Sequence, residues 1–261
     1  MKITLIISLL TLALNSCSVN GASLNTGEDE NGNIKKVEAS EKMSTKTESI
    51  AKFSKIDSDI VAKIVFVQDK GGKSKIEIKG NDNLLDIVKY EVNGGTLRLY
   101  HKKGYKVEGK PKITVTVTST QLTELSTDGV GSIEIAKLET PSFTLDSDGV
   151  GNCELGTIKA DRFKINNDGV GSVEIAKLTA KDVEIINSGV GSISVSGTAD
   201  NAKFSNSGVG SIEAGNLKCK TIDADNSGVG SIECNASTKA FYKKGGVGSV
   251  NISGSGEKIK K

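Results

Sequence analysis

The sequence predicts an all-β protein, a right-handed parallel β-solenoid or β-helix whose coils of about 20 residues each contribute to two sheets. Three observations predict it. The tripeptide Gly-Val-Gly occurs seven times between residues 129 and 248, at spacings of 20, 20, 20, 19, 20 and 18 residues. After each copy, Ile and Val alternate with polar residues, as in strands. The 261 residues include 30 glycines, two prolines and no tryptophan.

Residues 1–16 are typical of an export signal peptide, because Lys2 gives a basic start to an apolar stretch, Ile3 to Leu14. About a dozen apolar residues are too few for a membrane-spanning helix, which needs ~20. Cys17 follows, and its setting resembles the lipobox of bacterial lipoproteins, in which the cysteine is acylated. We therefore expect Cys17 to be a lipid anchor. Asn15 departs from the small or aliphatic residue usual there, so a plain secreted form is the alternative.

The segment between the signal and the repeats divides in two. Residues 18–49 are polar without a sustained apolar period, so we expect 17–49 to be a lipidated cysteine followed by a flexible tether. In residues 50–128 strand patterns continue without the repeat, and we expect irregular β rungs that cap the solenoid, with a separate small β domain as the alternative. Asn93-Gly94-Gly95 predicts a tight turn. Asn81-Asp82-Asn83 predicts the start of a short helix.

Residues 129–252 form the predicted solenoid. In the first copy Ile133 and Ile135 alternate with polar residues, Leu138 follows at a corner, and Phe143 and Leu145 belong to a second strand. Seven coils of this kind, ~4.8 Å apart, would extend about 34 Å. Parallel crossover connections favour a right-handed path. Residues 253–261 form a charged C-terminal tail, which we expect to block edge-to-edge growth of the sheets.

The Gly-Val-Gly copies predict structural turns and not nucleotide loops, because a phosphate-binding loop occurs once and precedes a helix. Glycine reaches backbone angles that a Cβ disfavours, and we expect the valine between the glycines to point into the core. Short polar residues before each turn, such as Asn167 and Asp168, are expected to bond to the backbone and stack as a ladder. The turn glycines are Gly129, Gly131, Gly149, Gly151, Gly169, Gly171, Gly189, Gly191, Gly208, Gly210, Gly228, Gly230, Gly246 and Gly248.

The sequence gives no set of residues for catalysis, a cofactor or a metal. His101 is the sole histidine, which excludes a histidine-based zinc site or a nucleophile–histidine pair within the repeats. One carboxylate per coil recurs at the repeat period. We expect this column to be a solvated outward face, with a weak divalent-cation stripe as the alternative. The column consists of Glu134, Glu154, Glu174, Glu213 and Glu233, interrupted by Ser194.

The cysteines and the charge balance indicate which bonds and partners to expect. Cys153 and Cys234 stand where other copies hold apolar residues, so we expect both to be buried free thiols. A disulfide framework among Cys153, Cys219 and Cys234 is not expected. The 34 basic and 32 acidic residues nearly balance, and Arg98 and Arg162 are the only arginines. No nucleic-acid partner is therefore expected.

Several segments resemble one known family. They are the stretch Phe53-Ser54-Lys55-Ile56, residues 76–85, the turn at residues 93–97 and the serial copies of Gly-Val-Gly-Ser-Ile-Glu. Through them, roughly residues 50–250 resemble the head GIN domain of putative auto-transporter adhesins. The resemblance implies a right-handed β-helix similar to pectin lyases, in an exported protein or lipoprotein of Gram-negative bacteria. It implies no catalytic residues.

Together these patterns and the resemblance predict a non-catalytic lipoprotein of the cell envelope that acts as an adhesin. It would be exported to the outer membrane, facing the cell surface or the periplasm. The alternative is a periplasmic structural or scaffolding lipoprotein, followed by a polysaccharide-active enzyme. The expected partners are the membrane through the lipid anchor, an unknown protein or glycan ligand, and a second copy of the chain.

Overall fold

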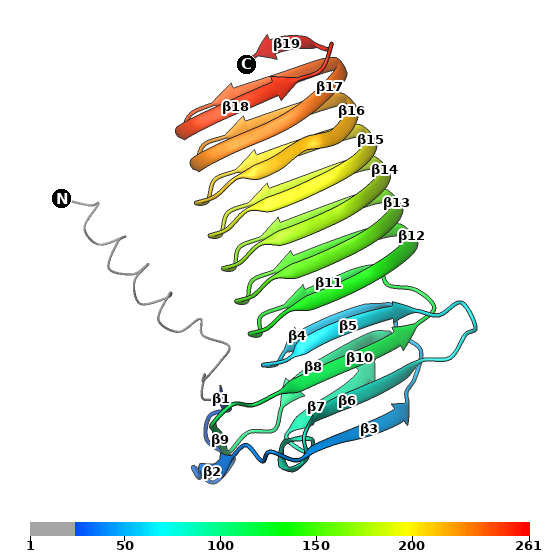
Figure 1. Cartoon of the computed structure of the whole chain (residues 1–261), viewed down its shortest axis with the longest axis vertical. Coiled ribbons are helices and arrows are strands. Elements are labelled where there is room, and N and C mark those ends of the chain that lie inside the picture. Colours follow the sequence, from blue (N-terminus) through cyan, green and yellow to red (C-terminus); the bar gives the residue numbers. More distant parts are fainter. Residues whose placement is uncertain (1–23) are drawn as a thin grey trace, which may run out of the picture.

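The computed structural model describes residues 24–261 as a β-solenoid of about seven turns that stands on an N-terminal cap (Figure 1). Cys17 and the predicted signal peptide lie outside the described residues. The cap elements are β1 (Leu24–Asn25), β2 (Lys35–Glu38), β3 (Met43–Ser49), β4 (Lys55–Asp59), β5 (Lys63–Gln68), β6 (Lys75–Asn81), the 3₁₀ turn η1 (Asp82–Leu84), β7 (Val88–Asn93), β8 (Thr96–His101), β9 (Tyr105–Glu108) and β10 (Ile113–Ser119). The coil strands are β11 (Glu124–Thr127), β12 (Ile133–Ser147), β13 (Cys153–Asn167), β14 (Val173–Asn187), β15 (Ile193–Asn206), β16 (Ile212–Asn226), β17 (Val229–Lys244), β18 (Val247–Ser253) and β19 (Glu257–Lys260).

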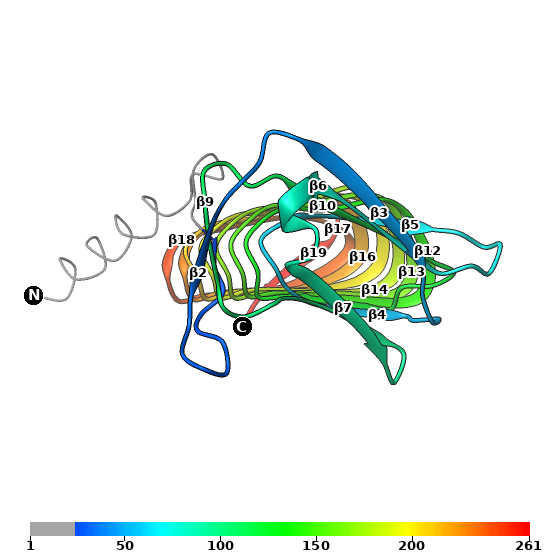
Figure 2. The same cartoon turned by 90° about the horizontal axis from the view of Figure 1, so that it is seen from below.

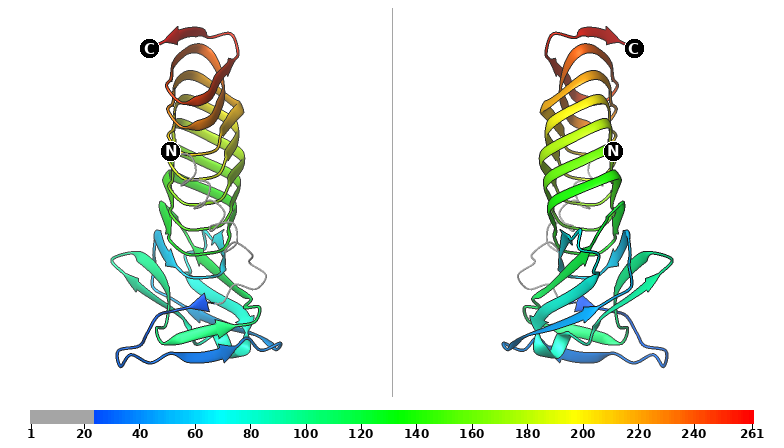
Figure 3. Two further views of the ribbon diagram at one scale, coloured as in Figure 1. Left: turned by 90° about the vertical axis from the view of Figure 1, so that its left-hand side faces the viewer. Right: turned by 90° about the vertical axis from the view of Figure 1, so that its right-hand side faces the viewer.

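The coils pair in parallel, and their register shifts only in the pairs from β14 to β17, which confirms the predicted solenoid. Ile133 of β12 lies beside Cys153 of β13, which lies beside Val173 of β14. Each coil was expected to contain two strands, but β12 to β16 each run through 14 or 15 residues without a break. The strand bends from one sheet into the other. It remains a single strand because the inter-coil hydrogen bonds continue around the corner. The repeated coils are visible side by side in Figure 3.

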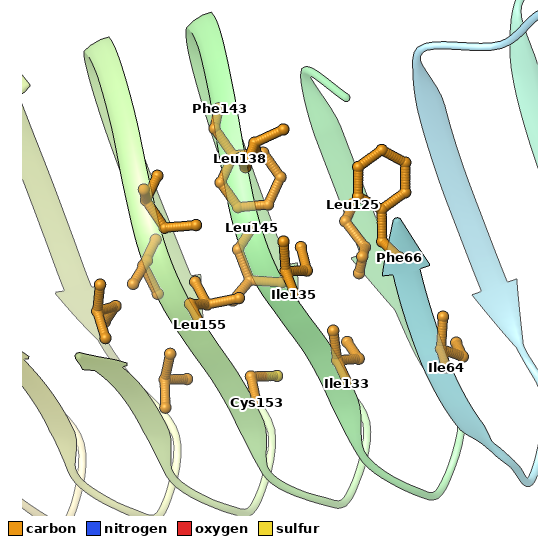
Figure 4. Close-up of a cluster of buried hydrophobic side chains, with 14 of the residues drawn as sticks. Ile64, Phe66, Leu125, Ile133, Ile135, Leu138, Phe143, Leu145, Cys153 and Leu155 are labelled. Carbon is orange, nitrogen blue, oxygen red and sulfur yellow. The ribbon is translucent and has the colours of Figure 1, made fainter. Parts of the chain in front are cut away.

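The core is a narrow space between the two sheets, filled by one inward side chain at every second residue. Ile133, Ile135, Phe143 and Leu145 are all buried. Figure 4 shows these side chains stacked in rows with their equivalents in neighbouring coils, such as Cys153. The rings of Phe143 and Phe163 lie 6.0 Å apart between centroids. Each such aliphatic or aromatic side chain contributes roughly 1.5–3 kcal/mol on burial.

The three cysteines of the described residues are buried and free, as expected. Burial raises the pKa of the Cys153 and Cys219 thiols to about 12 and that of Cys234 to about 11. They are therefore thiols at neutral pH and act as small apolar fillers of the core.

One coil precedes the repeats, within residues 50–128, where irregular β rungs are predicted. β4 pairs with β11 and β5 pairs with β12, both in parallel, so residues 55–68 form a coil beneath the first Gly-Val-Gly turn. In this coil Ile60-Val61-Ala62 takes the place of the tripeptide, and Val61 lies beside Val130. β6 to β10 are inserted between β5 and β11, whereas β1 to β3 precede β4 in the chain.

The rest of the cap lies across the lower end of the solenoid (Figure 2). β8 and β10 continue the stack in parallel below β4 and β5, whereas β7, β6 and β3 add antiparallel strands. A separate sheet has the order β1-β9-β2. The predicted turn at Asn93-Gly94-Gly95 is confirmed as the β7–β8 hairpin, with φ of +56° at Gly94 and +79° at Gly95. The predicted short helix is a single 3₁₀ turn.

The predicted flexible tether is wrong for residues 24–49. β1 and β2 both pair with β9, and β3 pairs with β6 from Met43 beside Asn81 to Ser49 beside Lys75. Six of the seven residues of β3 are exposed, so this strand has no buried face and shows no apolar period. Backbone pairing along the edge of β6, and not burial, holds it.

The predicted charged tail, residues 253–261, contains a further strand, β19, which belongs to the main sheet. β19 pairs in parallel with β17, from Glu257 beside Lys239 to Lys260 beside Tyr242. Lys258 Nζ donates a hydrogen bond to the carbonyl oxygen of Ile252 in β18 at 2.6 Å. Lys261 Nζ lies 2.6 Å from both carboxylate oxygens of Asp223. Ammonium groups therefore lie along the open end of the solenoid.

Candidate binding faces

The solenoid presents four surfaces: a tight edge that contains the glycine turns, the corner opposite to it, and two broad sheet faces between them. At the tight edge, successive turns hydrogen-bond directly through their backbones. Val190 N donates to Gly169 O at 2.9 Å, and Gly171 N donates to Val190 O at 2.9 Å. All fourteen predicted turn glycines lie on this edge.

Each turn uses its two glycines for different reasons. A Cβ on Gly169 would collide with the carbonyl oxygen of Gly149 in the coil below. Gly171 has a φ of +146°, which a residue with a Cβ rarely adopts, and its Cβ would collide with the carbonyl oxygen of Gly151. Close backbone stacking therefore requires glycine at both places. Ile60 and Ala62 can stand at the equivalent places of the preceding coil, since both have negative φ.

The prediction that the turn valines point into the core is wrong. Val130, Val150, Val170 and Val190 are half-exposed, and the exposed fraction rises to 43% at Val209, 49% at Val229 and 73% at Val247. Along each coil the inward places alternate, so residues 147 and 149 lie inside and residue 150 lies outside. The valines therefore form an outward apolar column along the tight edge.

The inward place beside each turn is taken by a polar side chain. Asn167 Nδ2 donates to Asn187 Oδ1 at 2.8 Å, Asn187 Nδ2 to Asn206 Oδ1 at 3.0 Å, and Asn206 Nδ2 to Asn226 Oδ1 at 3.0 Å. Asn187 Nδ2 also reaches Gly191 O at 3.2 Å. All four asparagines are buried. The ladder predicted from sequence is present, inside the core, and it satisfies turn carbonyls that would otherwise lack a donor.

The glutamate face is the outer surface of the first half of each coil, with Glu134, Glu154, Glu174, Glu213 and Glu233 in one column. Only Glu134 has an ion-pair partner among the described residues, Lys63 Nζ at 2.6 Å. Residues with small side chains run beside the column, such as Ala136, Gly156 and Ala176. They leave a shallow open depression of about 250 Å³. The column is solvent-exposed, as expected.

The opposite face, formed by the second half of each coil, has mixed charges that are paired between coils. We call it the paired face. Glu184 accepts from Lys164 at 3.2 Å on one side and from Lys203 at 3.1 Å on the other. Lys243 lies 3.6 Å from Asp225. Exposed pairs of this kind contribute only about 0–1 kcal/mol each. Their effect here is that the paired face has little uncompensated charge.

Within residues 24–261, no group of three or more His, Cys, Asp or Glu residues is placed to hold a metal ion. His101 is mostly buried, and its Nε2 accepts a hydrogen bond from Val61 N at 2.8 Å. Burial lowers its pKa to about 4, although the nearby Asp59 carboxylate acts in the opposite direction. His101 thus supports the first turn of the stack as a neutral imidazole. Within the same residues, no helix is long and apolar enough to cross a membrane.

The structure places the predicted site residues as follows. The turn glycines share the tight edge, the five glutamates share one face, and Cys17 lies outside the described residues. The contact of Lys63 with Glu134 is not among the sequence predictions. Ile64, Val65 and Phe66 have the same alternation as Ile133, Glu134 and Ile135, and aligning the two segments would have placed Lys63 next to the glutamate column.

Comparison with solved structures supports the same architecture. A putative adhesin from Bacteroides fragilis is 31% identical, with 86% of this chain and 99% of that chain covered and a TM-score of 0.61. A putative adhesin from Parabacteroides merdae, 19% identical, covers 87% of this chain and 99% of its own with a TM-score of 0.69, and shares the fold. A putative lipid binding protein from Parabacteroides distasonis, 24% identical, covers 87% and 100% with a TM-score of 0.69 and also shares the fold.

Among curated proteins, none matches the chain. The family model described as putative auto-transporter adhesin, head GIN domain, matches residues 52–256, which include most of the cap and nearly all of the solenoid. The match therefore spans well over half of the sequence. On this evidence the chain belongs to the head GIN domain family of putative auto-transporter adhesins.

Proposed function

We propose that this protein is a non-catalytic adhesin of the cell envelope, anchored through a lipid on Cys17, that binds a protein or glycan ligand through the glutamate face. The difference between the two sheet faces carries the proposal. Charges on the paired face are compensated between coils, whereas four of the five glutamates opposite have no ion-pair partner among the described residues.

The glutamate face suits a ligand that carries positive groups. Its carboxylates recur at the coil spacing of ~4.8 Å, and neighbouring charges in water repel by about 1 kcal/mol. A cationic ligand would relieve this repulsion. Within the molecule, the ammonium group of Lys63 already contacts Glu134 in this way. The small side chains beside the column leave the carboxylates accessible.

Three observations favour an adhesin over an enzyme. The family and the structural relative above 30% identity are named as putative adhesins. The depression on the glutamate face is shallow and open, whereas catalytic sites are typically concave and enclose the substrate. The coils are joined by continuous backbone hydrogen bonds, which make the faces rigid and limit the ordering cost of binding.

The test uses two triple variants with the same change in net charge. Glu154→Lys/Glu174→Lys/Glu213→Lys alters the glutamate face, and Asp146→Lys/Asp182→Lys/Asp223→Lys alters the paired face. Binding to immobilised polylysine and to chitosan, a cationic glycan, is measured at low and moderate ionic strength. We expect binding to be lost in the first variant and kept in the second. Equal losses would contradict the assignment of the face.

Exposure at the cell surface is tested separately. Intact cells that express the full chain are treated with a protease or labelled with an antibody against the solenoid. A surface adhesin is cleaved and labelled without cell lysis. Protection until the outer membrane is opened would instead support the periplasmic scaffold.

A further inference from the structure

The beginning of the described chain is firmly held by the cap. Leu24 in β1 pairs with Val107 in β9, and both side chains are buried. Thr26 N donates to Tyr105 O at 2.9 Å, and Tyr105 N donates to Thr26 Oγ1 at 2.9 Å. The cap thus fixes the point at which the preceding chain enters the folded body.

The position of Leu24 limits how far the body can stand from a lipid anchor. Six residues separate Cys17 from Leu24. Seven Cα–Cα steps reach at most roughly 25 Å even when fully extended. The long tether expected from sequence would have let the body turn freely. With a lipid on Cys17, β1 must instead lie close to the membrane.

β1 and the last strand, β19, lie at opposite ends of the long axis (Figure 1). An anchor close to β1 therefore places the cap, and not the C-terminal coils, next to the bilayer. The three-stranded sheet β1-β9-β2 and its loops are the part of the cap nearest to the entry point.

The surface of this sheet and its loops carries exposed lysines and one exposed isoleucine. Residues 27–38 and 102–112 together contain seven lysines and five acidic residues. Lys35, Lys36, Lys102 and Lys103 are exposed, and the side chain of Ile34, the residue directly before β2, is 43% exposed. Lysines near a bilayer attract anionic headgroups, and exposed apolar side chains enter the headgroup region.

The acidic groups of the same surface are partly engaged. Asp29 accepts hydrogen bonds from Asn31 N at 2.9 Å and Asn33 N at 2.8 Å, which turns its carboxylate toward its own loop. Glu108 lies 3.6 Å from Lys106 and 4.0 Å from Lys36. Glu28, Glu30 and Glu38 are exposed on the surface. The lysines of residues 102–103 extend from the loop before β9, where Lys102 Nζ lies 5.7 Å from the ring centre of Tyr105.

We propose that the cap rests on the surface of an anionic bilayer through Ile34 and the lysines of β2 and of the loop before β9, so that the solenoid points away from the membrane. The proposal rests on the lipid anchor of the proposed function. It adds an orientation, in which the glutamate face stands perpendicular to the membrane and remains open along its length.

The test uses the full lipidated chain in vesicles of phosphatidylethanolamine and phosphatidylglycerol that contain a headgroup-attached quencher. A thiol-reactive fluorophore is placed at Ile34→Cys or, as a matched control, at Lys244→Cys in the last full coil. Cys153, Cys219 and Cys234 are buried thiols and remain unlabelled. We expect several-fold stronger quenching at residue 34 than at residue 244. Equal quenching, or stronger quenching at 244, would overturn the orientation.

The role of the lysines is tested with Lys35→Glu/Lys36→Glu, with Lys218→Glu/Lys220→Glu on the solenoid as the control. The first variant should reduce quenching at residue 34 in anionic vesicles and not in purely zwitterionic ones. No reduction would overturn the lipid contact of these lysines.

Flotation of the same vesicles separates failure of the anchor from failure of the orientation. The native chain should float with the vesicles, and Cys17→Ala should not. If Cys17→Ala floats as well as the native chain, or neither floats, the lipid anchor is refuted and the orientation with it. If flotation depends on Cys17 but the quenching pattern is reversed, the orientation alone is refuted.

Discussion

The tight edge of the solenoid and the corner opposite to it follow the same backbone path and tolerate change very differently. At the tight edge, successive turns stay in line from Val130 to Val229 through an unbroken series of parallel bridges. At the corner the register shifts between Ile175 and Leu178 and again between Ala214 and Lys218. The repeat spacings of 19 and 18 residues arise at this corner.

Packing explains the difference. At the tight edge the backbones of neighbouring turns are so close that a Cβ at Gly169 or Gly171 has no room. At the corner, side chains such as Lys177 point into solvent, and the chain can lose a residue without changing which side chains face the core. The repeat is therefore regular in sequence where the backbones of neighbouring coils touch, and it varies in length where the chain faces solvent.

The largest contrast is expected between two substitutions to valine. Gly169→Val forces a Cβ into the carbonyl oxygen of Gly149 and should destabilise the protein by more than about 4 kcal/mol or prevent folding. Lys177→Val, at the exposed corner, should change stability by no more than about 0.5 kcal/mol. Thermal unfolding followed by circular dichroism measures both. Equal melting temperatures would contradict the close stacking of turns.

The next contrast concerns chain length. An alanine inserted after Asp168 at the tight edge shifts the following residues by one place, which exchanges inward and outward side chains until the next turn. An alanine inserted after Lys177 should be absorbed at the corner and cost roughly 1 kcal/mol, by comparison with surface changes. Urea unfolding midpoints compare the two insertions. A corner insertion as damaging as the edge insertion would show that the corner is not tolerant.

The base of the tight edge should respond to pH through His101. Burial lowers its pKa in the folded state to about 4, from an ordinary value of 6.5. Below pH 6.5 the unfolded chain therefore binds a proton that the folded chain does not. Stability is complete above pH 6.5 and falls as the pH drops toward 4, by at most about 3 kcal/mol. In His101→Gln this loss should be absent when unfolding free energy is measured against pH. Parallel pH profiles would argue against the assignment.

A smaller effect on stability is expected from changes in the buried asparagine ladder. Asn187→Ala leaves Asn167 Nδ2 without its acceptor and Gly191 O without this donor, and should cost about 1–3 kcal/mol. Asn201→Ala is the matched control, since Asn201 is exposed and donates only to Asp182. It should change stability by less than about 0.5 kcal/mol. If the two alanine variants unfold at the same urea concentration, the buried ladder does not stabilise the edge.

Much of the coil could be predicted from local repetition. The period, the inward places of Ile133 and Phe143, and the turn places of the glycines each follow from a pattern that recurs seven times. The coil at residues 55–68 lies where irregular rungs are predicted, but Ile60-Val61-Ala62 lacks the glycines, so its exact place beneath the first Gly-Val-Gly turn follows from its pairing with β11 and β12. The binding faces were partly predicted: the glutamate column is visible in the sequence, but the ion pairs that distinguish the two faces are not.

The sequence by itself determined a stack of coils with a glycine edge and an apolar interior, because alternation and period are properties of neighbouring residues. Only the tertiary structure decided that the turn valines face solvent and that Asn187 faces the core, since that depends on the path of the backbone between two sheets. It also decided that residues 43–49 form a strand. Their pairing with β6 joins two distant segments through backbone hydrogen bonds, which leave no pattern in the side chains.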